Sequence, residues 1–162
     1  YGSKNTIDEI RKRFDYVFTP LRFGGGKPNL RLRDHHGSRL SVGGLSIVPI
    51  PVQHGNLPIF GYRIGPFAYI TDCSGVPESS LGLLDGVSHL VINALRYRPH
   101  PTHFNIDEAV ETAGRIGAKE VWLTHLCHEV SHKQLTKELE SCNNENRRIL
   151  PAYDGLEINV SW

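Results

Sequence analysis

The chain has 162 residues, enough for one domain, since single domains most often hold roughly 100–150 residues. Hydrophobic residues make up 39% and charged residues 22%, which is ordinary for a globular protein and excludes disorder and collagen. The 18 basic and 17 acidic residues leave a net charge of +1, so we expect no strong nucleic-acid binding. No apolar run approaches the roughly 18 residues of a spanning helix, so we predict one soluble domain over 1–162, with no membrane partner.

The cysteine count bears on the compartment. The chain has Cys73, Cys127 and Cys142, an odd number without a C-x-x-C pair, which argues against a disulfide framework. We therefore expect a reducing compartment and a cytoplasmic protein. Nine histidines favour imidazole and carboxylate chemistry over thiolate chemistry. The sequence has no methionine and starts with the bulky Tyr1, so we expect it to begin inside a longer protein.

The first 44 residues contain one clear helical pattern. Thr6 is followed three residues later by Glu9, as in a capping box, which predicts a helix near residues 6–14. The stretch 19–44 is rich in turn residues and predicts a long loop with short strands. We expect Asp34-His-His36 to lie exposed in this loop, and we assign its histidines no role.

After Gly44 the pattern changes to apolar, β-branched runs of strand length that alternate with helical patterns. The predicted strands are 45–52, 61–64, 67–71, 89–94, 121–124 and 156–160. The predicted helices are 79–84, 105–116 and 131–141, and the second of these begins at an Asn105 cap with Glu108 three residues on. This order of elements favours a sheet with helices packed on one or both faces.

Three polar residues occur where predicted strands end. His54, Asp72 and His125 each lie at the carboxyl end of a strand, where ligands gather in such folds. If these strands belong to one sheet, the three side chains converge, and two imidazoles with a carboxylate suit Zn, Mn or Fe. Two plainer interpretations stay open. A single histidine is commonly structural or solvated, and Asp72 before Ser74-Gly75 is also typical of an Asx-turn.

Two further histidines precede the helix predicted from residue 105. His100 and His103 lie just before its N-terminus, where backbone amides and the helix dipole attract anions. A substrate phosphate would fit there. The alternative is that Thr102 or Asn105 merely caps the helix and leaves the histidines exposed.

His128 follows His125 by three residues. The two would share a face if this stretch were helical, but Thr124-His125 is more typical of a strand exit. We therefore expect His128 to support the ligands or to relay a proton.

Taken together, these segments resemble a known family. The segments are Tyr1-Gly-Ser-Lys with the helix after it, Gln53-His54-Gly-Asn-Leu-Pro-Ile-Phe-Gly-Tyr62, Tyr69-Ile-Thr-Asp72-Cys, Asn93-Ala-Leu-Arg96, His103-Phe-Asn-Ile-Asp-Glu-Ala109, Leu123-Thr-His125-Leu-Cys-His128 and Tyr153-Asp-Gly-Leu-Glu-Ile158. The chain resembles the C-terminal two-thirds of a metallo-β-lactamase-superfamily hydrolase, most of all the phosphonate-operon-type cyclic-phosphate phosphodiesterases. This resemblance implies an α+β fold, the αββα sandwich with a mixed sheet and flanking helices, without its N-terminal portion.

The resemblance also implies roles for individual residues. His54 would be a ligand of one metal, Asp72 would bridge two metals, and His125 would complete the second site. The ions implied are two divalent cations, Zn or Mn. The catalytic residues implied are Asp72, His103 and His128, with His103 as a candidate proton donor to the leaving oxygen.

One family motif is absent. The H-x-H-x-D-H signature, which supplies four of the family's ligands, occurs nowhere in the sequence, and Asp34-His-His36 does not replace it. In the family this signature lies upstream of the segment like Tyr1-Gly-Ser-Lys, so its absence fits a chain truncated at its N-terminus. Each metal would then have at most two side chains from this chain, and we expect partial or no loading.

These observations leave competing functions. The first is a metal-dependent hydrolase, a phosphodiesterase that acts on a small phosphodiester with a hydroxide bridging two divalent metals, of which this chain is an incomplete part. The alternative is a catalytically incompetent, metal-poor domain of the same fold that acts by binding or dimerisation, and a homodimer stays open. A third keeps the fold but hydrolyses a thioester or a lactam.

Overall fold

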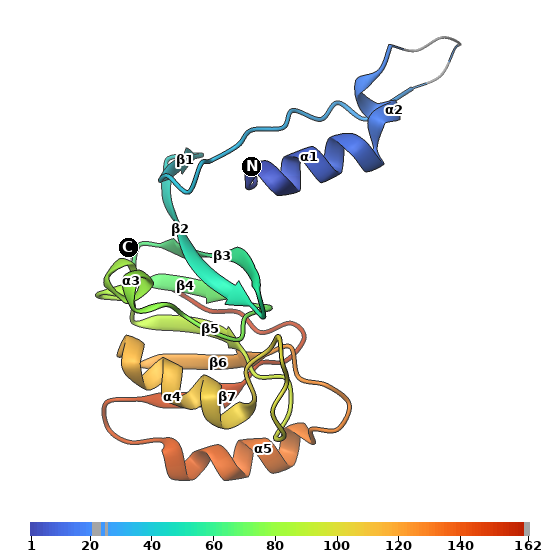
Figure 1. The fold of residues 1–162 in the computed structure, drawn as a ribbon. Coiled ribbons are helices and arrows are strands. Elements are labelled where there is room, and N and C mark those ends of the chain that lie inside the picture. The colour runs from blue at the N-terminus through green and yellow to red at the C-terminus, as the bar shows by residue number, and fades with distance from the viewer. Residues whose placement is uncertain (21–23, 25, 161–162) are drawn as a thin grey trace. The chain divides into compact units, whose positions relative to one another are not determined.

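The computed structural model describes residues 1–20, 24 and 26–160 (Figure 1). The chain divides into two compact units, Tyr1–Leu40 and Ser41–Trp162. The single domain expected over the whole chain stays a prediction.

The first unit contains the helices α1 (Lys4–Arg13) and α2 (Asp15–Phe18). The cap of α1 is Ser3, whose side chain accepts a hydrogen bond from the Thr6 amide at 3.2 Å. The predicted start at Thr6 is therefore wrong by two residues, because Ser3 takes the capping role.

The histidine pair of this unit differs from the expectation. His35 is 2% exposed, and its amide donates to the Gly2 carbonyl at 3.2 Å. Its predicted exposure is wrong, because a β-bridge between Gly2 and Asp34 carries the chain inward at this point. His36 is exposed, as predicted.

The second unit is built around a mixed sheet with the strand order β1 to β7. The strands are β1 (Leu40–Val42), β2 (Leu45–His54), β3 (Leu57–Ile64), β4 (Phe67–Ile70), β5 (His89–Asn93), β6 (Glu120–Thr124) and β7 (Arg148–Pro151). β2, β3 and β4 pair antiparallel, and β4, β5, β6 and β7 pair parallel. A mixed sheet with helices is the α+β class that the sequence predicted.

Five predicted strands are confirmed and one is wrong. Residues 156–160 form no strand, although Leu156 and Ile158 are half-buried while Glu157 and Asn159 are exposed. Alternating burial therefore occurs here without a hydrogen-bonded ladder. The last strand is instead β7, in which Ile149 lies opposite Val121 of β6.

The helices of this unit lie close to the predicted ranges. They are α3 (Glu78–Leu81), α4 (Ile106–Ile116) and α5 (His132–Leu139), with 3₁₀ turns at Gly82–Leu84 and Glu140–Cys142. The predicted Asn105 cap of α4 is confirmed as a full capping box. The Asn105 side chain accepts from the Glu108 amide at 2.9 Å, and the Glu108 carboxylate accepts from the Asn105 amide at 2.8 Å. None of the helices in the described ranges is long and apolar enough to cross a membrane.

The core aligns three strand ends. Ile70 lies opposite Ile92, and Ile92 lies opposite Leu123, in the parallel part of the sheet. All three are fully buried, together with Ala109 and Ala113 of α4. Because β4, β5 and β6 run parallel in this register, the residues after them emerge at one edge of the sheet (Figure 1).

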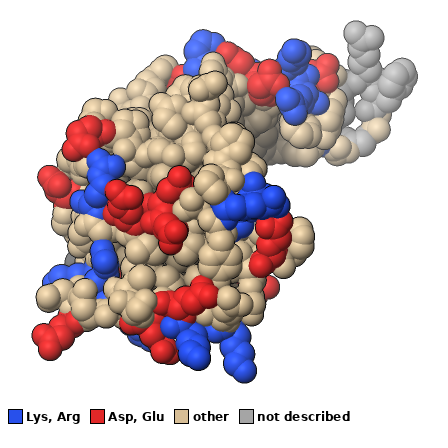
Figure 2. All heavy atoms as spheres, turned by 60° about the horizontal axis from the view of Figure 1, so that its bottom comes forward, with Lys and Arg blue, Asp and Glu red and all other residues tan. Residues whose placement is uncertain are grey.

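Figure 2 shows acidic and basic side chains close together on the face drawn. Among the described residues, Arg98 pairs with Glu129 at 2.6 Å and Arg115 pairs with Glu78 at 2.6 Å. This mixture agrees with the net charge of +1.

Candidate metal centre

Four side chains meet at this edge of the sheet. His54 is the last residue of β2, Asp72 follows β4, and His125 comes directly after β6. His103 lies in the loop between β5 and α4. The sheet thus places the three strand-end residues singled out in the sequence, and the loop adds a fourth.

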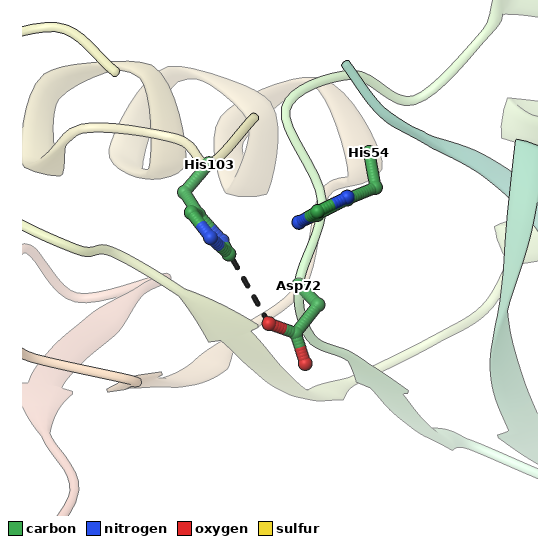
Figure 3. Close-up of side chains that lie close together, drawn as sticks. All are labelled: His54, Asp72 and His103. Atoms are coloured by element: carbon green, nitrogen blue, oxygen red, sulfur yellow. Dashed lines mark ion pairs between the residues drawn. The ribbon is translucent and has the colours of Figure 1, made fainter. Parts of the chain in front are cut away.

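Three of these residues form a compact donor set (Figure 3). One ligand atom each from His54, Asp72 and His103 lies within 4.8 Å of the others. His103 Nδ1 is 3.8 Å from Asp72 Oδ1, and the ring centroids of His54 and His103 are 4.9 Å apart. Imidazole nitrogens and a carboxylate oxygen are the donors that zinc accepts, so these side chains fit a divalent metal.

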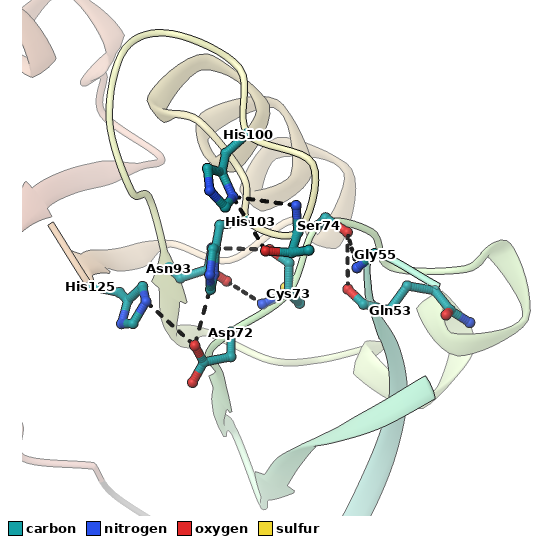
Figure 4. Close-up of polar contacts among 10 residues, drawn as sticks. Gln53, Gly55, Asp72, Cys73, Ser74, Asn93, His100, His103 and His125 are labelled. Atoms are coloured by element: carbon teal, nitrogen blue, oxygen red, sulfur yellow. Dashed lines mark hydrogen bonds and ion pairs between the residues drawn. The ribbon is translucent and has the colours of Figure 1, made fainter. Parts of the chain in front are cut away.

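His125 lies beside His103 and also faces Asp72 (Figure 4). Its Nε2 atom is 3.4 Å from the same Asp72 Oδ1 atom, and its ring centroid is 4.8 Å from that of His103. One carboxylate oxygen therefore faces two imidazoles that reach it from different parts of the fold. No hydrogen bond of the Asx-turn type involves the Asp72 carboxylate among the described residues.

The backbone at this edge is unusual. Asp72 has a φ of +56° and His125 a φ of +62°, both in the left-handed region that most side chains avoid. Such a conformation costs about 1–3 kcal/mol and persists only where surrounding contacts hold it. Left-handed residues of this kind cluster at functional sites, which supports this edge as the site of the domain.

The environment of His103 favours the neutral imidazole. Burial of the ring lowers its pKa, and the neighbouring His125 and His54 lower it further, while Asp72 raises it. The side chain is 12% exposed, and no described side chain or backbone group forms a hydrogen bond with its buried Nδ1 atom. The neutral imidazole offers a lone pair to a metal, whereas donation of a proton to a leaving oxygen requires the protonated ring.

The capping alternative for the loop before α4 is partly correct, and the phosphate site stays a prediction. Asn105 does cap the helix, but His103 is not exposed. His100 lies beside His103, with ring centroids 5.0 Å apart, and its Nδ1 atom is 3.3 Å from the amide and the hydroxyl of Thr102. The sequence predicted a role for His103 near phosphate. It did not predict that His103 shares a donor set with His54 and Asp72. The spacing of His103 in the sequence does not predict this position, because the loop before α4 brings the residue to the other two.

His128 is not part of this cluster. It is exposed in a turn after β6, and among the ion pairs and ring contacts of the described residues none joins it to the four. Its catalytic role stays a prediction.

A small cavity opens beside His125. It has a volume of about 230 Å³ and is lined by Thr124, His125, Leu126, Ala152, Tyr153 and Asp154. Tyr153 is 61% exposed, and its ring meets the edge of His132 with centroids 6.5 Å apart. The loop after β7 therefore forms one wall of the space next to His125.

Residues 1–126 match a family described as the beta-lactamase superfamily domain, and the chain belongs to this family. It is 37% identical over 167 residues to an octanoyltransferase of Porphyromonas gingivalis, covering 99% of this chain and 32% of that protein. Among solved structures, a diphosphatase from the PhnP family has a TM-score of 0.82 and 31% identity, covering 96% of this chain and 55% of that chain. The chain thus spans about a third and about half of these relatives.

More distant structures show the fold alone. Human tRNase Z, short form, matches with a TM-score of 0.62 at 18% identity, covering 100% of this chain and 67% of that chain. YhfI from Bacillus subtilis, a metallo-β-lactamase fold protein, matches with a TM-score of 0.66 at 20% identity, covering 96% of this chain and 62% of that chain. The resemblance to the metallo-β-lactamase superfamily and the α+β fold class are confirmed.

Proposed function

We propose that the chain is part of a metal-dependent hydrolase that cleaves a small phosphodiester. The observation that carries this proposal is the position of Asp72 Oδ1, which lies 3.4 Å from His125 Nε2 and 3.8 Å from His103 Nδ1. A carboxylate among imidazoles at strand ends is a donor set for borderline divalent cations.

The chain's own residues would divide two ions between them. His54 and Asp72 would hold one, and Asp72 and His125 the other, with Zn or Mn as the metals of the intact enzyme. The bound ions would supply Lewis-acid stabilisation of charge on the phosphoryl oxygens. With no more than two of these side chains for each ion, partial or no loading of this chain alone is our expectation.

His103 would work on the proton. Its ring lies beside His54, Asp72 and His125 while Asn105, not His103, caps α4. From this position it would give a proton to the leaving oxygen, which requires the charged ring that Asp72 favours and that burial, His125 and His54 disfavour. His128, three residues after His125, would be a supporting group.

The substrate class draws on the named relatives. The 31% identical structure is called a diphosphatase, so phosphoryl chemistry is the first candidate. The 37% identical relative is called an octanoyltransferase, which keeps an acyl substrate such as a thioester as the second.

The free thiols Cys73, Cys127 and Cys142 are compatible with a cytoplasmic protein.

Metal content and a two-substrate assay test this proposal. The chain and the full-length protein that contains it would be loaded with Zn²⁺ or Mn²⁺, and metal per chain measured beside hydrolysis of bis(p-nitrophenyl) phosphate and of an octanoyl thioester. Metal-dependent phosphodiester hydrolysis by the full-length protein supports the proposal. Thioester cleavage alone would select the acyl substrate. Absence of metal and of both activities from the full-length protein would leave the metal-poor binding or dimerisation domain, which sedimentation would examine for a homodimer.

A further inference from the structure

The segment after Asp72 connects the parts of the metal centre. The Gln53 amide donates to the Gly75 carbonyl at 2.9 Å, and the Ser74 amide donates back to the Gln53 carbonyl at 2.7 Å. The Phe104 amide donates to the Cys73 carbonyl at 2.8 Å. Residues 73–75 are therefore bonded to the neighbour of His54 on one side and to the neighbour of His103 on the other.

The side chain of Asn93 binds this segment through two hydrogen bonds. Asn93, the last residue of β5, is fully buried. Its Oδ1 atom accepts from the Cys73 amide at 2.9 Å, and its Nδ2 atom donates to the Cys73 carbonyl at 3.0 Å (Figure 4). A carboxamide supplies the donor and the acceptor together, as this pairing requires.

The need for such a clamp lies in the backbone of Asp72. Its φ of +56° turns the chain sharply out of β4, and a conformation of this kind is maintained by its surroundings. Cys73 comes next and is fully buried, where an unpaired amide is unfavourable, while its carbonyl also accepts from the Phe104 amide. Asn93 pairs with both and so fixes the direction in which Asp72 leaves the strand.

We propose that Asn93 is a positioning residue for the metal centre, one that aims the Asp72 carboxylate at His54, His103 and His125. The inference rests on the proposed function for the metal, but the clamp itself involves only this chain. No hydrogen bond of the described residues joins the Asn93 side chain to these histidines or to the Asp72 carboxylate. Its effect on the metal would pass through the Cys73 backbone. Groups that orient ligands in this way typically change metal affinity by about 10–100-fold.

The test compares Asn93→Leu, which removes the clamp at similar volume, and Asn93→Asp, which keeps the acceptor and removes the donor. Ser80→Ala is the matched control, because Ser80 is 1% exposed and its hydroxyl donates to the Pro51 carbonyl at 2.6 Å and not to the Cys73 segment. Zn²⁺ affinity would be measured by competition with a chelator in the full-length protein, below the unfolding temperature of each variant. We expect at least a tenfold loss for Asn93→Leu, a smaller loss for Asn93→Asp, and less than a threefold change for Ser80→Ala. If Asn93→Leu does not fold, Asn93→Asp becomes the deciding variant. Wild-type Zn²⁺ affinity in the deciding variant would overturn the positioning role of Asn93.

A second measurement needs no metal. Amide hydrogen exchange in a peptide covering residues 70–76 should accelerate in the Asn93 variants and stay unchanged in Ser80→Ala. If the wild type binds no Zn²⁺, the proposed function fails, and this exchange then decides whether Asn93 holds the Asp72 turn. Equal exchange in the wild type and the Asn93 variants would refute the clamp.

Discussion

Asp72 Oδ1 lies 3.4 Å from His125 Nε2, although the two residues follow strands that are separated in the sheet by β5. Both have left-handed backbones, with φ values of +56° and +62°. The left-handed turns after β4 and β6 thus end with the two side chains facing each other. The parallel strands of the sheet thus bring together two side chains of the proposed metal site.

Removing the Asp72 charge should abolish metal loading. In Asp72→Asn the shared anionic oxygen is lost, and we expect metal per chain and phosphodiester hydrolysis to fall together, each by at least tenfold. Elemental analysis and the hydrolysis assay of the full-length protein would measure both. Asp85→Asn, at an exposed acidic position, is the control and should change neither. Full metal content in Asp72→Asn would contradict a bridging role.

Substitution of His103 separates its two roles. We expect His103→Ala to lower turnover on a phosphodiester by roughly 10²-fold or more while metal content stays the same, as for a proton donor. Loss of metal would instead make His103 a ligand, which its place in the donor set with His54 and Asp72 allows. Unchanged turnover would return it to a structural role. His36→Ala, at an exposed histidine, provides the comparison.

The three cysteines should differ in reactivity. Burial raises the pKa of the Cys73 thiol to about 12, so at pH 8 only about one molecule in ten thousand carries the thiolate. Cys127 and Cys142 are only half-buried. We expect a thiol reagent such as DTNB to label no more than these two in the folded chain and all three after unfolding in urea. Rapid labelling of Cys73 in the folded state would show that β4 and its exit open readily.

The capping box of α4 should contribute measurably to stability. Asn105 is 7% exposed, so water poorly replaces the side-chain oxygen that is lost in Asn105→Ala. We therefore expect a loss of about 1 kcal/mol in the free energy of unfolding. Urea denaturation would measure it. Ser131→Ala is the control, since the Ser131 cap of α5 is exposed and its bond is longer, at 3.4 Å. An equal loss in the two variants would mean that burial of the box adds nothing.

The sequence by itself determined the elements that depend on local patterns. Apolar runs and turn residues define β2 to β6, and the Asn105 and Glu108 pair defines the start of α4, because neighbours along the chain decide these features. The placement of His54, Asp72 and His125 at strand ends also follows from the sequence. Their convergence needed only the inference that the strands share one sheet.

Only the tertiary structure decided how loops and buried polar groups are used. His103 reaches His54 and Asp72 because the loop before α4 is bonded to Cys73, and Asn93 acts on that residue from a strand twenty positions away. β7 pairs with β6 while the regular alternation of 156–160 forms no ladder. Each of these features depends on contacts between residues far apart in the chain. Local propensity does not predict such contacts, because it reflects only neighbouring residues.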